Sequence, residues 1–93
     1  METNNTLNKV CAMLCGLGYK ATVEHPPYIL LQFSFADLHI GTANGPWEMD
    51  VCIDGDIQNA NTGLPADSTV EQVFAWICDE AKKTQKAFNA RYL

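Results

Sequence analysis

The chain has 93 residues, a length that suits one domain built around a single hydrophobic core. Apolar residues make up 47% of it, which excludes a disordered protein, and no apolar run is long enough to span a bilayer. The net charge of −5 disfavours direct nucleic-acid binding, because phosphate groups would be repelled. The polar N-terminus lacks the basic start and apolar stretch of a secretory signal, so we expect a cytoplasmic protein.

The first predicted element is an amphipathic helix over residues 6–16. Its apolar side chains recur at the spacing of one helix face, at Leu7, Val10, Cys11 and Leu14. Gly16 and Gly18 follow, and glycine favours a helix end because it adopts the left-handed conformation found there. The strand expected next ends at His25-Pro26-Pro27, since proline has no N–H to donate to a sheet.

The middle of the chain predicts an antiparallel meander of four or five strands, because strand-like segments follow one another with turn-length connections. The expected strands are residues 19–24, 28–35, 38–42, 47–53 and 56–58. The turns between the last four are expected at Ala36-Asp37, Asn44-Gly45-Pro46 and Asp54-Gly55. Residues 28–35 carry four large apolar side chains at period two and are expected to form the central strand.

Residues 47–53 alternate strictly between apolar and other side chains, which is the pattern of a strand with one buried face. Successive side chains of a strand point to opposite faces of the sheet. The core side is therefore expected to hold Trp47, Met49, Val51 and Ile53, and the other side Glu48, Asp50 and Cys52.

A long C-terminal helix is expected to complete the domain after a loop at residues 59–67. Ser68 and Glu71 have the spacing of a capping box, in which the N-cap residue and the side chain three residues later bond reciprocally. Neither glycine nor proline interrupts the chain beyond them, so a helix of more than twenty residues is expected. The predicted architecture is a single α+β domain, residues 1–93, with an antiparallel sheet flanked by the two helices.

The charged residues are unevenly distributed along the chain. The 61 residues from Ala21 to Ala81 contain ten acidic side chains and neither lysine nor arginine. The segment after Glu80 has the opposite sign, with Lys82, Lys83, Lys86 and Arg91. The strand pattern and the adjoining hairpin predict one negative patch of Glu48, Asp50, Asp54 and Asp56. Such a patch either keeps the protein in solution and guards an edge strand, or docks on a basic partner.

No arrangement of residues indicates catalysis or a cofactor. The four cysteines are Cys11, Cys15, Cys52 and Cys78. They lack the paired spacing of structural zinc sites, and we expect reduced thiols. His39 has no serine or cysteine near it in sequence that would pair with it as a nucleophile. We therefore predict a protein that is not an enzyme and binds neither metal nor cofactor.

The chain resembles the small acidic inhibitor proteins of phages and other mobile elements, the anti-CRISPR proteins among them. The resemblance rests on length, the minimal α+β plan, the lack of catalytic motifs and the acid-only span Ala21–Ala81. It implies a protein of the bacterial cytoplasm that occupies a basic nucleic-acid-binding groove of a CRISPR effector. The partner-binding residues that it implies are Asp37, Glu48, Asp50, Asp54, Asp56 and Trp76. Trp76 stands off the apolar stripe of its helix, as an exposed interface anchor would, or packs under the N-terminal helix.

Two other functions fit the same plan. A helix, antiparallel strands and a final helix in a small acidic protein also resemble secretion chaperones, which bind unfolded segments as dimers. A stable homodimer with exposed apolar grooves is expected in that case. The last alternative is a small ligand-binding or enzymatic module that uses His39 together with nearby carboxylates.

Overall fold

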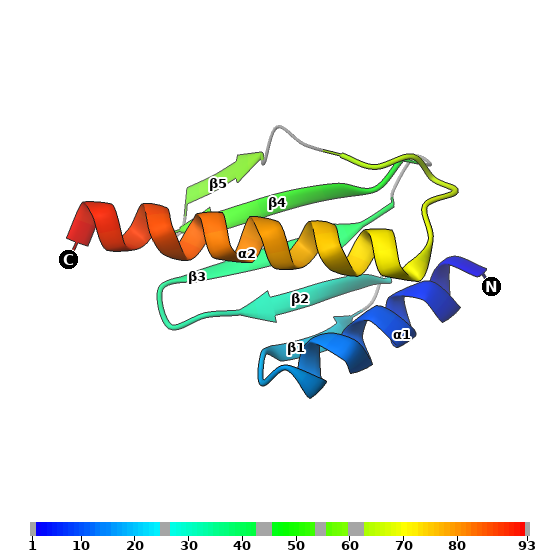
Figure 1. Cartoon of the computed structure of the whole chain (residues 1–93). Coiled ribbons are helices and arrows are strands. Elements are labelled where there is room, and N and C mark those ends of the chain that lie inside the picture. The colour runs from blue at the N-terminus through cyan, green and yellow to red at the C-terminus, as the bar shows by residue number, and fades with distance from the viewer. Residues whose placement is uncertain (1, 25–26, 43–45, 54–55, 60–62, 93) are drawn as a thin grey trace.

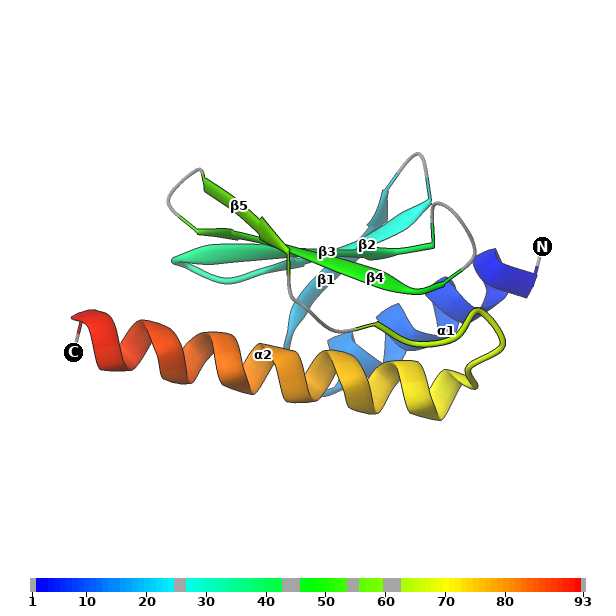
Figure 2. The same ribbon diagram turned by 90° about the horizontal axis from the view of Figure 1, so that it is seen from above.

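The computed structural model describes residues 2–24, 27–42, 46–53, 56–59 and 63–92, and it has two layers. One layer is a five-stranded antiparallel sheet, and the other consists of two helices that lie against the same face of that sheet (Figure 1, Figure 2). The elements in chain order are α1 (Glu2–Gly16), β1 (Lys20–Glu24), β2 (Tyr28–Gln32), β3 (Ala36–Gly41), β4 (Glu48–Ile53), β5 (Asp56–Asn59) and α2 (Val70–Tyr92). The predicted α+β class is confirmed, including the long C-terminal helix of 23 residues.

The five strands lie side by side in chain order, so the sheet is a simple meander with β3 at its centre. The prediction that residues 28–35 form the central strand is wrong, because β2 ends at Gln32 and lies second in the sheet. Ala36-Asp37 is not a turn either, since β3 begins at Ala36. The chain turns before it, where the Phe33 N–H donates to the Ala36 carbonyl oxygen over 2.8 Å.

Aromatic packing explains this difference from the predicted strand. The Phe33 and Phe35 rings stack on each other with centroids 5.5 Å apart. Phe35 also stacks on Phe88 of α2 at 4.0 Å, and Phe33 meets Tyr19 edge-on. The phenylalanines of the turn thus form an aromatic cluster with side chains that are distant in sequence. Phe33 and Phe35 have the spacing of strand residues, but they lie in the turn between β2 and β3. Their packing with α2 outweighs the local preference for a strand.

The core lies between the sheet and the helices and follows the predicted alternation. The side chains of Met49 and Val51 are buried, whereas those of Glu48 and Asp50, which alternate with them along β4, are exposed. The sheet contributes Ala21, Ile29, Leu31, Leu38, Ile40, Met49 and Val51, and the helices contribute Leu7, Val10, Leu14, Val73, Ile77 and Ala81. One face of the sheet is therefore covered by apolar side chains of both helices.

Helix α1 ends as its glycines predict. Gly18 has a φ of 94°, a left-handed conformation that glycine adopts without steric cost. The Tyr19 N–H donates to the Leu14 carbonyl oxygen over 3.1 Å, and the Gly18 N–H donates to that of Cys15 over 3.0 Å. These two bonds form a Schellman motif, which satisfies carbonyl groups at the end of the helix and directs the chain into β1.

The cap of α2 lies one residue later than predicted. The Gln72 N–H donates to the Thr69 hydroxyl oxygen over 3.1 Å, and the Thr69 N–H donates to the Gln72 side-chain oxygen over 2.8 Å. The capping box is therefore Thr69 with Gln72, and the predicted pairing of Ser68 with Glu71 is wrong. The Ser68 hydroxyl instead donates to the Pro65 carbonyl oxygen over 2.7 Å, in the turn that precedes the helix.

We expect Thr69→Ala to lower the free energy of unfolding by about 1 kcal/mol, because it leaves a helix N–H without its acceptor. Ser68→Ala removes the same hydroxyl group from the neighbouring residue and is the matched control, with a smaller expected loss. Chemical denaturation of both variants measures the difference. Equal losses would contradict the assignment of Thr69 as the N-cap residue.

The predicted turns at Asn44-Gly45 and Asp54-Gly55, and the strand end at His25-Pro26, lie outside the described residues. Within the described part of the chain, no helix combines the length and the apolar character that a membrane span requires.

Candidate functional site

Among the described residues, no helix lies on the face of the sheet that points away from α1 and α2 (Figure 2). We call it the open face and define it by the outward side chains of the five strands. From β1 to β5 these are Lys20, Thr22, Glu24, Tyr28, Leu30, Gln32, Asp37, His39, Gly41, Glu48, Asp50, Cys52 and Ile57. Its position on a rigid sheet fixes the relative placement of these groups before any partner arrives.

The open face is strongly negative. It carries the carboxylates of Glu24, Asp37, Glu48 and Asp50 and one cation, Lys20. Lys20 lies on the edge strand β1, whereas Glu48 and Asp50 lie on β4, with two strands between them. The Glu24 carboxylate accepts a hydrogen bond of 2.7 Å from the Thr22 hydroxyl.

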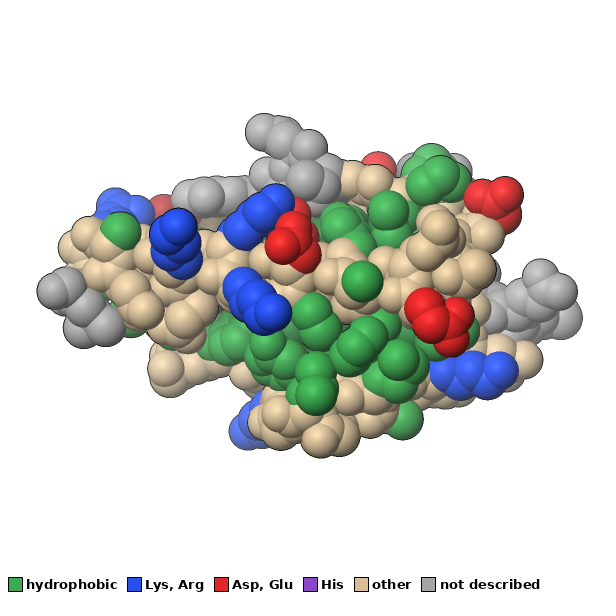
Figure 3. Space-filling view, in the orientation of Figure 1, with side chains coloured by type: hydrophobic (Ala, Val, Ile, Leu, Met, Phe, Trp, Pro, Cys, Tyr) green, Lys and Arg blue, Asp and Glu red, His purple; other side chains and the backbone are tan. Residues whose placement is uncertain are grey.

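The cations near the carboxyl end do not neutralise this face. They belong to α2, in the layer on the other side of the sheet, and Figure 3 shows basic side chains along that helix. Both ion pairs among the described residues belong to Lys83, whose Nζ lies 3.2 Å from Asp79 and 3.3 Å from Glu80. Hydrogen bonds to Asp79 and Glu80 raise the pKa of the Lys83 ammonium group. The cations of α2 are thus separated from the carboxylates of the open face by the sheet.

The structure brings together three of the predicted partner-binding residues. Asp37, Glu48 and Asp50 all lie on the open face, where Asp50 faces His39 and Glu48 faces Gly41 across the strand pair. Asp37 lies opposite Cys52, and it is half-buried. The positions of Glu48 and Asp50 follow from the strand alternation that the sequence indicates, whereas Asp37 lies on β3 rather than in the predicted turn.

The predicted patch of four carboxylates on one surface is wrong for Asp56. The register pairs Asp56 with Ile53, and directly opposed residues in an antiparallel pair share one face. Asp56 therefore lies on the side that carries Met49 and Val51, while Ile57 lies on the open face and is 71% exposed. Asp54 lies outside the described residues.

Trp76 is not part of the open face. It belongs to α2, on the covered side of the sheet, where it is half-buried and packs against the hydrophobic core. Trp76 is thus partly covered although it lies off the predicted apolar stripe of α2. The interpretation of Trp76 as an exposed anchor is therefore wrong, because its side chain packs against the core.

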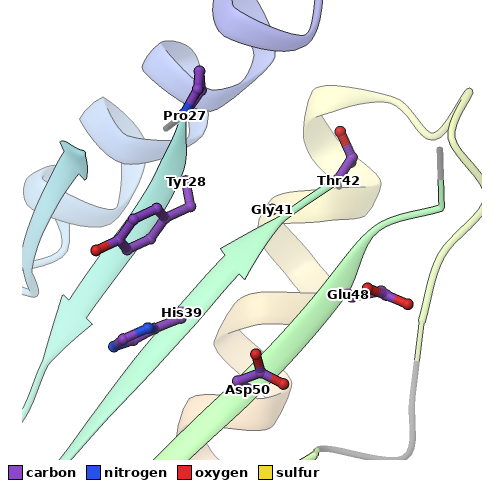
Figure 4. Close-up of a pocket in the computed structure, with 7 residues that line it drawn as sticks. All are labelled: Pro27, Tyr28, His39, Gly41, Thr42, Glu48 and Asp50. Carbon is purple, nitrogen blue, oxygen red and sulfur yellow. The ribbon is translucent and has the colours of Figure 1, made fainter. Parts of the chain in front are cut away.

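A pocket of about 540 Å³ opens on the open face, between β2 and β4 (Figure 4). Its lining residues are Pro27, Tyr28, His39, Gly41, Thr42, Glu48 and Asp50. The Tyr28 and His39 rings stack with centroids 5.3 Å apart and an angle of 24° between their planes. The absent side chain of Gly41 leaves room between Tyr28 on one side and Glu48 on the other.

Sequence reasoning missed Tyr28 and Gly41. A Cβ atom added at Gly41 would lie 3.2 Å from the Tyr28 Cβ, so the two residues are close neighbours, while the Tyr28 ring stacks on His39. The only signal in the sequence is the outward position of Tyr28 in its strand, because the pairing itself depends on the register of β2 and β3.

The four cysteine thiols differ in exposure, and two of them have a raised pKa. All four cysteines are free, and Cys15 is the exposed one. Burial, together with the neighbouring Cys15, raises the pKa of the Cys11 thiol, and burial raises that of Cys78. Among the described residues, no three histidine, cysteine or acidic side chains converge as a metal site would require.

These pKa shifts predict the order of thiol modification. A raised pKa lowers the fraction of thiolate near pH 8, and the thiolate is the nucleophile. We therefore expect iodoacetamide to label Cys15 several-fold faster than Cys11 or Cys78. Peptide mass spectrometry of a time course measures the rates. Faster labelling of Cys11 than of Cys15 in the folded protein would contradict this prediction, and unfolding in urea should equalise the rates.

The helix side presents a different surface. Figure 3 shows apolar side chains gathered along the border of α2. A second pocket of about 330 Å³ lies there and is lined by Tyr19, Phe33, Ala81, Lys82, Gln85, Lys86 and Asn89. The molecule thus has an acidic open face and a helix side that is partly apolar and carries charges of both signs. No family model, curated protein or solved structure matches the chain.

Proposed function

We propose that this protein is a non-enzymatic inhibitor that docks its open face on a positively charged, nucleic-acid-binding surface of another protein. A CRISPR effector complex of a bacterial host is the kind of target that we propose, in the manner of a phage-encoded inhibitor. The observation that carries the proposal is the excess of four carboxylates over one edge lysine on a sheet face that no helix covers.

The spacing of these carboxylates supports the proposal. Side chains two residues apart on one strand are separated by about 7 Å, and neighbouring strands by about 5 Å. Glu48 and Asp50 follow the first spacing on β4, and Asp37 lies on the adjacent strand. A groove that binds nucleic acid presents arginine and lysine side chains toward a row of phosphates, and fixed carboxylates offer those side chains an alternative partner.

Electrostatics also favour selection of a basic partner. Opposite potentials speed the encounter of two proteins and disfavour partners of like charge. The α2 cations lie in the other layer, so the negative field of the open face is not offset locally. We expect association to be fast and to weaken as salt is raised. The reason is that salt screens the charges, and the screening length is about 8 Å at physiological ionic strength.

A competition experiment tests this function. Purified CRISPR effector complexes of several types are loaded with fluorescent target DNA, and the protein is added at increasing concentration. We expect displacement of the DNA from at least one type, with an affinity that declines steadily as sodium chloride is raised. Retention of DNA by every effector at saturating protein, with unimpaired plasmid interference in cells, would reject the proposal.

The dimeric chaperone remains the second candidate, because of the partly apolar pocket beside α2. That surface would have to bind a second copy or an unfolded segment. Light scattering at working concentration separates the two candidates. A monomer would reject the chaperone function, whereas a stable dimer that protects Tyr19 and Phe33 from solvent would favour it.

A further inference from the structure

We propose that the pocket between β2 and β4 holds the guanidinium group of one arginine side chain of the partner protein. This inference rests on the proposed docking of the open face and names the residue type that the pocket receives. The pocket has about 540 Å³ of space and lies where the open face is most negative, beside Glu48 and Asp50.

The shape of the pocket follows from one glycine. Gly41 lies opposite Glu48 on β4 and next to Tyr28 on β2, and it has no side chain to fill the space between them. Figure 4 shows Tyr28 and His39 on one side of this space and Glu48 and Asp50 on the other. The result is a slot with an aromatic wall on β2 and β3 and an acidic wall on β4.

A guanidinium group matches both walls at once. It is planar, so one of its faces stacks on an aromatic ring, and the stacked rings of Tyr28 and His39 offer such a surface. Its N–H groups point outward in the same plane and reach paired carboxylate oxygens. Glu48 and Asp50 both line the slot, next to the paired rings. A lysine ammonium group is compact and strongly hydrated, so it fits the acidic wall but gains less from the aromatic one.

Competing occupants fit the slot less well. A phosphate or carboxylate would meet two like charges, and an apolar group would desolvate Glu48 and Asp50 without pairing them. No ion pair with another described residue engages either carboxylate, because both ion pairs in the described part of the chain involve Lys83. The charges therefore remain available for a cation that another molecule supplies.

Two peptides test the inference directly. They have the same glycine-spaced sequence with four arginines in one and four lysines in the other. Calorimetry gives their affinities, and amide chemical shifts show where they bind. We expect the arginine peptide to bind about three- to fivefold more tightly, as stacking on an aromatic ring predicts. We also expect its largest shifts at Tyr28, His39 and Gly41.

Gly41→Ala is the decisive variant, because its Cβ fills the floor of the slot and leaves every charge in place. Gly16→Ala is the matched control, since nothing lies within 4 Å of a Cβ at that position. We expect the arginine preference to vanish in Gly41→Ala and to persist in Gly16→Ala. Tyr28→Ser removes the larger ring of the aromatic wall and leaves His39, and it provides a second test if Gly41→Ala folds poorly by circular dichroism.

The outcomes separate this inference from the function on which it rests. Equal binding of both peptides at Glu48 and Asp50 would overturn the arginine pocket and leave docking on a basic surface intact. An arginine preference that survives in both Gly41→Ala and Tyr28→Ser would also overturn it. Binding of neither peptide, together with DNA retained by every effector, would reject the docking function itself.

Discussion

Leu38→Ala is expected to lower the free energy of unfolding by about 3 kcal/mol, within the usual range for a fully buried leucine. Leu38 lies on the central strand, between Leu31 of β2 and Val51 of β4, and it is 0% exposed. The surrounding strands cannot close the cavity, because they are fixed by their hydrogen bonds on both sides of β3. Urea denaturation followed by circular dichroism measures the loss.

Leu30→Ala is the matched control for this prediction. It is the same truncation on the neighbouring strand, but Leu30 points to the open face and is half-buried. Less apolar area returns to water, so its loss should be under half that of Leu38→Ala. Equal losses would mean that the open face is covered by apolar contacts in solution, which contradicts its description as a free surface.

Joint replacement of Glu48 and Asp50 by lysine is expected to weaken binding to the basic target by about 100-fold, because two attractive contacts become repulsive. Both side chains are exposed, so the fold should tolerate the change. The DNA competition assay measures the loss through the concentration of protein that displaces half of the DNA. The difference from wild type should shrink at high salt, since screening weakens repulsion as well as attraction.

The control for this pair is Asp56→Lys with Asp67→Lys. It changes the net charge by the same amount, and both residues are exposed, but neither lies on the open face. We expect this variant to displace DNA with at most a few-fold loss, through its weaker long-range attraction. Equal losses in the two double variants would show that only net charge matters, and the open face would then not be the docking surface.

Short-range sequence patterns were sufficient to predict most of the helices and strands. The alternation in residues 47–53 placed Glu48 and Asp50 on the face away from the core, because the period of a strand is set by its backbone. Gly18 ended α1 as expected, since its left-handed conformation is a local property. The capping box shifted by one residue because Thr69 and Ser68 are both good N-caps, and Gln72 rather than Glu71 bonds back.

The errors arose where distant residues compete with local preference. Phe33 and Phe35 have strand spacing, yet they form a turn because Phe88 of α2 completes their aromatic cluster. Trp76 lies off the predicted stripe of its helix, yet its side chain packs against the hydrophobic core. Neither contact can be predicted from the sequence around the residue that it affects.

The sequence by itself determined the class of fold, the excess of acid in the strands and the outward direction of Glu48 and Asp50. Only the tertiary structure decided which outward residues become neighbours. Strand register moved Asp56 to the covered side and brought Tyr28 next to Gly41, in the same pocket as His39 and the two carboxylates. The physical reason is that the direction of a side chain depends on its own strand, whereas its neighbours depend on the pairing of separate strands.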